Sequence, residues 1–194
     1  MEGTNPVNKK LAAALSGGAV LVLALSGCSS DDGNKKLDDW AEKVCDTAVQ
    51  PQSKKIADAN AAIKKQTADN SSPEEVKKTD SQAFQDISDA YKERSAALKK
   101  AGAPPVDDGE KKLNDATKEL DGLSKSYADL KARTDKLNTK DQSAFADDLA
   151  KVAEELGKLS KSENTAQKRL ESGEVGKAMR KQDGCKAGSS PSAS

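Results

Sequence analysis

The spacing of apolar residues constrains the fold of this 194-residue chain more than any other feature of its sequence. Over much of its length these residues recur three or four positions apart, which is the period of an amphipathic helix. One stretch consists of Leu113, Ala116, Leu120, Leu123, Tyr127, Leu130, Thr134 and Leu137, and the next of Phe145, Leu149, Val152, Leu156, Leu159, Glu163, Ala166 and Leu170. Thr134 and Glu163 are the polar exceptions. Because each helix has a single apolar stripe, the helices must pack along their lengths to be stable.

Two earlier stretches are less regular. The apolar residues of the first are Leu37, Trp40, Val44, Ala48, Ile56, Ala59 and Ile63, and those of the second are Val76, Phe84, Ile87, Tyr91 and Leu98. Pro51 interrupts the first stretch. Since proline lacks a backbone donor, it should kink or split that helix.

Signals for helix ends lie between these stretches. Ser72, Pro73 and Glu75 are an N-cap, a first-turn proline and a capping-box glutamate in the right order. Gly102, followed by two prolines, predicts the end of that helix. Two further starts are expected at Asp107 with Glu110 and at Thr139 with Gln142, and a final stop at Gly184.

These signals predict an all-α protein with four long helices and a short fifth one. The expected ranges are about 35–67, 73–101, 108–138, 140–171 and 174–183. Short connections favour antiparallel neighbours, so we expect an up-down four-helix bundle. A spectrin-like three-helix coiled coil with the first segment laid across it is an alternative. An intermolecular coiled coil is another, although Pro and Gly in the connections favour folding back.

The N-terminus has the features of a bacterial export signal. Lys9 and Lys10 precede an apolar run from Leu11 to Leu25, which is too short for a permanent membrane span. The run closes with Leu25, Ser26, Gly27 and Cys28, the order of a lipobox. This predicts cleavage before Cys28 and a covalent diacylglycerol on its thiol. An ordinary secretory signal with a chance cysteine, or an uncleaved membrane anchor, is the alternative.

Lipidation of Cys28 defines the expected location and organisation of the chain. Two fatty chains suffice for stable anchoring, so we expect a lipoprotein held at the extracytoplasmic face of the cell membrane. Residues 1–27 are then a signal peptide, 28–36 a polar flexible tether and 37–186 the helical-bundle domain. Residues 187–194 consist of small and polar residues and should be a disordered tail.

The two remaining cysteines, Cys45 and Cys185, bracket this domain. Outside the cytoplasm disulfides persist, and an even number of antiparallel helices returns the chain to its starting end. We therefore expect a Cys45–Cys185 disulfide. Two free thiols are the alternative, whereas a zinc site would lack ligands.

Composition argues against several kinds of activity. The chain has no histidine, which excludes catalysis by histidine and His-ligated metals. Without residues 1–27 it carries 30 basic and 31 acidic residues, so no basic surface for nucleic acid is expected. Adjacent acids recur, at 31–32, 38–39, 107–108, 147–148 and 154–155, but neighbours on a helix point apart and are expected to be solvated. We expect no enzyme activity, no metal and no other cofactor.

Three aromatic side chains are candidates for contact with a ligand. Trp40 could stack on a ligand, but a role in the core or in shielding the disulfide is expected instead. Tyr91 and Tyr127 fall on apolar stripes, where packing is the better interpretation.

Short motifs give the chain a resemblance to a known group. The segment Trp40–Asp46, the pair Pro51-Gln52, the segment Lys55–Asn60 and the late Asp183-Gly184-Cys185 carry it. On these residues the chain resembles small secreted lipoproteins of actinobacteria, notably of Streptomyces, over residues 11 to 186. The resemblance implies location at the outer face of the plasma membrane, under the wall, and implies no activity.

Two functions fit these expectations. The first is a non-enzymatic structural or interaction protein of the cell envelope that presents a surface to another protein or to a wall component. The alternative binds a small molecule or lipid between its helices. The Ala-rich interior predicts tight packing and little room for a ligand, and a reproducible small-molecule adduct would favour the alternative. Whether any inter-helix cavity exceeds about 300 Å³ is the most informative structural observation.

Overall fold

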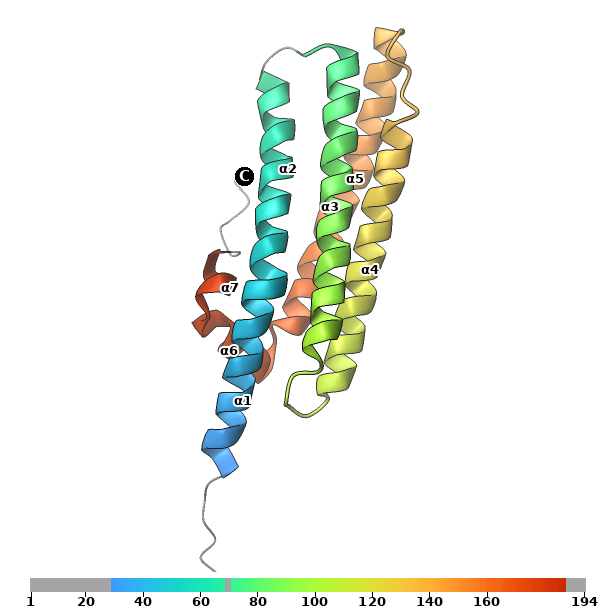
Figure 1. The fold of residues 1–194 in the computed structure, drawn as a ribbon. Helices are drawn as coiled ribbons and strands as arrows, with labels where there is room; N and C mark the ends of the chain where they lie inside the picture. The colour runs from blue at the N-terminus through green and yellow to red at the C-terminus, as the bar shows by residue number, and fades with distance from the viewer. Residues whose placement is uncertain (1–28, 69–70, 188–194) are drawn as a thin grey trace, which may run out of the picture.

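The computed structural model describes residues 29–68 and 71–187, and these form an all-α helical bundle. Figure 1 shows α2, α3, α4 and α5 as long helices lying side by side, with α1 continuing α2 at one end. The elements are α1 (Ser29–Val44), the π-helical turn η1 (Cys45–Val49), α2 (Gln50–Ala68), α3 (Pro73–Ala101), α4 (Gly109–Thr134), α5 (Gln142–Leu170), α6 (Gly173–Lys181) and α7 (Asp183–Ala187).

Pro51 disrupts the first helical segment as predicted, and the disruption is a π-helical turn. The backbone N–H of Gln50 donates to the carbonyl of Cys45, five residues earlier. In a regular helix, the ring of Pro51 would clash with the carbonyl four positions earlier. The wider π-helical turn lies just before Pro51, where it relieves this clash. The segment therefore continues as one rod, from α1 through η1 into α2.

The predicted limits of α3 are confirmed in detail. The Ser72 side chain accepts from the N–H of Glu75, and the Glu75 carboxylate accepts from the Ser72 N–H, which completes a capping box. Gly102 ends the helix with φ +83°, a backbone conformation that favours glycine.

The predicted starts of the next two helices are wrong by one or two residues. α4 begins at Gly109 after Asp108, which adopts a left-handed conformation and makes no side-chain cap, so Asp107 does not cap it. α5 is capped by Asp141, whose carboxylate accepts from the N–H of Ala144. Thr139 instead donates to Glu74 on a neighbouring helix end. Thr139 therefore makes a tertiary contact, and the residue directly before Gln142 provides the cap.

The segment predicted to be a flexible tether, residues 28–36, is helical from Ser29 onward. Leu37 and Trp40 are buried, and a helix held there extends backward without a new nucleation step. Residues 1–27 with the lipobox, Cys28, and the tail from 188 to 194 lie outside the described residues. Ala187, the first residue of the expected tail, ends α7.

The predicted disulfide is present. Cys45 and Cys185 are bonded with their Cα atoms 4.9 Å apart, joining η1 to α7 across 140 positions of sequence. Gly184 was predicted to stop the last helix but lies inside α7. A Cβ there would lie 2.5 Å from the Asp46 carboxylate and 3.0 Å from the carbonyl carbon of Cys45. Glycine therefore permits the close approach of α7 to η1.

The aromatic side chains belong to the core, as expected. Tyr91 of α3 and Tyr127 of α4 stack with ring centroids 5.7 Å apart. Trp40 is 7% exposed and donates its indole N–H to the carbonyl of Gly102 at 2.9 Å. These contacts fill the interface between α3 and α4 and the end of the bundle near the disulfide.

Candidate functional site

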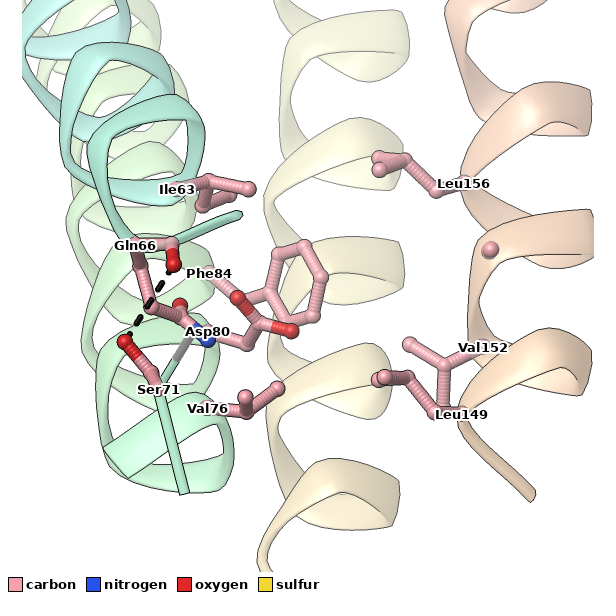
Figure 2. A pocket seen from close by; sticks show the side chains of 10 residues that line it. Ile63, Gln66, Ser71, Val76, Asp80, Phe84, Leu149, Val152 and Leu156 are labelled. Atoms are coloured by element: carbon pink, nitrogen blue, oxygen red, sulfur yellow. Dashed lines mark hydrogen bonds between the residues drawn. The ribbon is translucent and has the colours of Figure 1, made fainter. Parts of the chain in front are cut away.

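The bundle is not filled throughout. Near the last turn of α2 and the first turns of α3, a cleft of about 360 Å³ opens between these two helices and α5. Figure 2 shows side chains from α2 and α3 on one side of the cleft and from α5 on the other. The lining residues are Ile63, Gln66, Ser71, Val76, Asp80, Phe84, Leu149, Val152, Ala153 and Leu156.

The α5 wall of the cleft is apolar because of the helical spacing of that segment. Leu149, Val152 and Leu156 recur three and four positions apart, so they lie on one face of α5. Figure 2 shows these three side chains directed toward Asp80 and Phe84 across the cleft. α5 packs along α4. Leu149, Val152 and Leu156 of α5 line the cleft.

Asp80 is the polar centre of the cleft. Its side chain lies on α3 one turn after Val76 and one turn before Phe84, on the stripe that faces the interior. Asp80 is 8% exposed, and its Oδ1 atom is buried and has no hydrogen-bond partner. A buried acceptor without a partner costs free energy, so its presence in an otherwise apolar wall requires a reason.

Burial raises the pKa of the Asp80 carboxyl from its usual 3.8 to about 6. Removal of water from the charged form is the cause. No Lys or Arg occurs among the described residues that line the cleft. At neutral pH, Asp80 is therefore a largely ionised carboxylate in apolar surroundings.

A second acceptor lies in the same cleft. The side-chain Oε1 of Gln66, near the end of α2, is buried without a partner. Ser71 does not satisfy it, because its hydroxyl donates to the backbone carbonyl of Gln66 at 3.2 Å, the contact drawn in Figure 2. The cleft thus combines an apolar body with two buried acceptors, Asp80 Oδ1 and Gln66 Oε1.

Sequence reasoning missed this site. Asp80 stands four residues from both Val76 and Phe84, in the gap of the second and less regular apolar stripe. An acid at that spacing was the available signal. The pairs of adjacent acids are on the surface where they are described, as expected: Asp38, Asp148 and Glu154 form ion pairs with lysines.

Other polar features of the bundle lie in contacts between its helices, and among them Arg94 Nε and Glu119 Oε2 are also buried without a partner. A cleft of about 290 Å³ between α4 and α5 holds the ion pair of Arg133 with Glu155. Buried Arg94 on α3 donates to Gln52 of α2 at 2.5 Å, which joins these two helices. Burial lowers the pKa of Arg94, and the charge of Glu171 opposes that shift. These groups stabilise helix contacts and leave the Asp80 cleft as the stronger candidate site.

Within residues 29–68 and 71–187, no three Cys, Asp or Glu side chains gather closely enough to hold a metal ion. No helix in the same ranges has the length and apolar composition needed to cross a membrane. Comparisons with protein-family models, with curated proteins and with solved structures found no match.

Proposed function

We propose that this chain is an extracytoplasmic lipoprotein whose helical domain binds a small amphiphilic molecule in the cleft between α2, α3 and α5. One observation carries the proposal: the cleft measures about 360 Å³ and encloses a buried carboxyl without a partner. Ligand pockets of proteins range from about 300 to 1,000 Å³ and combine apolar walls with few polar groups. The tight packing expected from an Ala-rich interior does not extend to this end of the bundle.

The proposed role is binding without catalysis. Asp80 is the one charged side chain among the described residues that line the cleft, and its polar neighbours there are Gln66 and Ser71. A single carboxylate among apolar side chains supports recognition of a ligand more directly than it supports a reaction. A structural or interaction role in the envelope remains the prediction made from sequence, and the cleft favours ligand binding over it.

The proposed location depends on the Leu25–Cys28 motif and on the resemblance to actinobacterial lipoproteins. The helix α1 begins at Ser29, directly after the proposed lipid site, and continues into α2. This continuity would hold the bundle at a defined distance from the membrane instead of on a loose tether. We expect Cys28→Ala to release the protein from membranes and to abolish labelling with palmitate. Unchanged labelling would contradict lipidation.

The proposed topology is an up-down bundle of four long helices, α2 to α5, with α1, α6 and α7 at the disulfide end. The direct contacts of α3 with α2 and α4, and of α4 with α5, support it. In this order α2 and α5 are the outer pair. The cleft lies where these two helices stand apart.

The proposed function is tested by filling the cleft. Ala153 lies at its rim on α5 and is exposed, so a phenylalanine there can enter the cleft without disturbing the core. Ala150, one turn earlier on α5, is exposed and does not line the cleft, so Ala150→Phe is the matched control. Native mass spectrometry of protein purified from its own cells should show a small-molecule adduct in the wild type and in the control. The adduct should be absent from Ala153→Phe.

An adduct of equal occupancy in Ala153→Phe would mean that the ligand binds elsewhere. Absence of any adduct, together with no binding of added apolar probes, would refute the proposed function.

A further inference from the structure

We infer that the ligand of this cleft carries a protonated amine, which binds between Asp80 and Gln66 while its apolar body lies against α5. The inference rests on the proposed function and specifies the chemical class of the ligand.

Two buried acceptor atoms of the cleft are not satisfied by its own donors, the Gln66 amide N–H₂ and the Ser71 hydroxyl. Asp80 Oδ1 and Gln66 Oε1 are both buried and unpartnered, and the Ser71 hydroxyl already donates to the backbone. A ligand that satisfies both oxygens must bring at least two donors. An alkylammonium group brings three donors and a positive charge, and its hydrogen bond to a carboxylate is stronger than a neutral one.

Charge complementarity points to the same group. Asp80 is the one charged side chain among the described residues lining the cleft, so nothing there neutralises it. An anionic ligand would place two negative charges together in apolar surroundings, which is unfavourable. A bound cation removes the cost of holding Asp80 ionised.

The surroundings of Asp80 favour an organic cation over a metal ion. Hard cations such as Ca²⁺ take six or more oxygen ligands, and the cleft offers the oxygens of Asp80, Gln66 and Ser71. The Phe84 ring, which Figure 2 shows beside the Asp80 carboxyl, gives an ammonium group an aromatic face. Leu149, Val152 and Leu156 then cover an alkyl or aryl chain.

The test compares three probes of one chain length: hexylammonium, hexan-1-ol and hexanoate. Their affinities for the purified full-length protein are measured by isothermal titration calorimetry in one detergent at neutral pH, above the pKa of Asp80. The variants are Asp80→Asn, which keeps the shape of the side chain, and Asp58→Asn, which removes an exposed carboxylate of α2 paired with Lys54. Binding of hexan-1-ol to Asp80→Asn shows whether the cleft is intact in that variant.

Hexylammonium should bind the wild type and Asp58→Asn about ten to a hundred times more tightly than hexan-1-ol, as expected for a hydrogen bond between charged groups. In Asp80→Asn this preference should disappear, while hexan-1-ol binds as before. Hexanoate should bind the wild type most weakly.

Equal binding of hexylammonium and hexan-1-ol by the wild type would overturn the inference and leave the proposed function standing. The inference would also be overturned if Asp80→Asn still preferred hexylammonium to hexan-1-ol, or if hexanoate bound the wild type more tightly than the other two probes. If no probe binds and Ala153→Phe leaves the adduct in native mass spectrometry unchanged, the proposed function fails together with the inference.

Discussion

Replacement of Asp80 by asparagine should make the protein more stable at neutral pH. Burial raises the pKa of this carboxyl from 3.8 to about 6. Between these values the folded state holds a proton that the unfolded state has released. The free energy of unfolding therefore falls as pH rises through this range, because unfolding releases that proton. Above pH 6 the folded protein carries the full cost of a buried charge, which asparagine does not have.

The magnitude follows from the size of the shift. Each pKa unit corresponds to about 1.4 kcal/mol, so a shift of about two units sets an upper value near 3 kcal/mol. Asp80 is 8% exposed but faces a cleft that opens to solvent, and screening by water reduces the effect. We expect Asp80→Asn to raise the free energy of unfolding at neutral pH by about 1 to 2 kcal/mol.

The assay is urea unfolding at a series of pH values for the wild type, Asp80→Asn and Asp58→Asn. The stability difference between Asp80→Asn and the wild type should be largest above pH 6 and should shrink toward zero as pH falls below 4. Asp58, which is exposed, should show no such gain. A variant Asp80→Asn that is less stable than the wild type at neutral pH, or a difference independent of pH, would refute the account of Asp80.

Two further predictions concern the frame of the bundle. Cys185→Ser should lower the free energy of unfolding by about 2 to 5 kcal/mol, because the Cys45–Cys185 bond closes a loop of 140 positions. Urea unfolding measures this loss, and an unchanged urea midpoint would contradict a stabilising role of the disulfide. Ser72→Ala should destabilise the protein by about 1 kcal/mol through loss of the capping box. Thr139→Ala should destabilise it by less than about 0.5 kcal/mol, because the hydrogen bond of Thr139 to Glu74 is exposed and Thr139 caps no helix. Equal losses for these two variants, measured by thermal unfolding, would contradict the assignment of the caps.

Much of the fold was predictable because the signals were local. The apolar periods from Leu113 to Leu137 and from Phe145 to Leu170 indicated the two long helices α4 and α5. Ser72, Glu75 and Gly102 marked both ends of α3 through groups only a few residues apart.

Errors arose where a distant part of the chain decided the local outcome. Thr139 was the expected cap of α5, but the helix is capped by Asp141, and Thr139 donates a hydrogen bond to Glu74 of a distant helix end. Gly184 could stop a helix, yet its role is to let α7 approach Cys45. The polar segment after Ser29 became helical because buried Leu37 and Trp40 hold the following turns.

The sequence alone determined the helical class, the long helices and the pairing of Cys45 with Cys185. Apolar spacing and helix capping depend on neighbouring residues, and the cysteine pairing was expected from the return of the chain to its starting end. The tertiary structure decided that α5 stands apart from α2 near Asp80, which creates the cleft. α5 packs along α4, and the cleft lies between α5 and the helices α2 and α3, whose lining residues are far apart in the chain. The spacing of Asp80 from Val76 and Phe84 places it on the apolar stripe of α3, but the cleft that it faces, and with it the candidate site, is a property of packing.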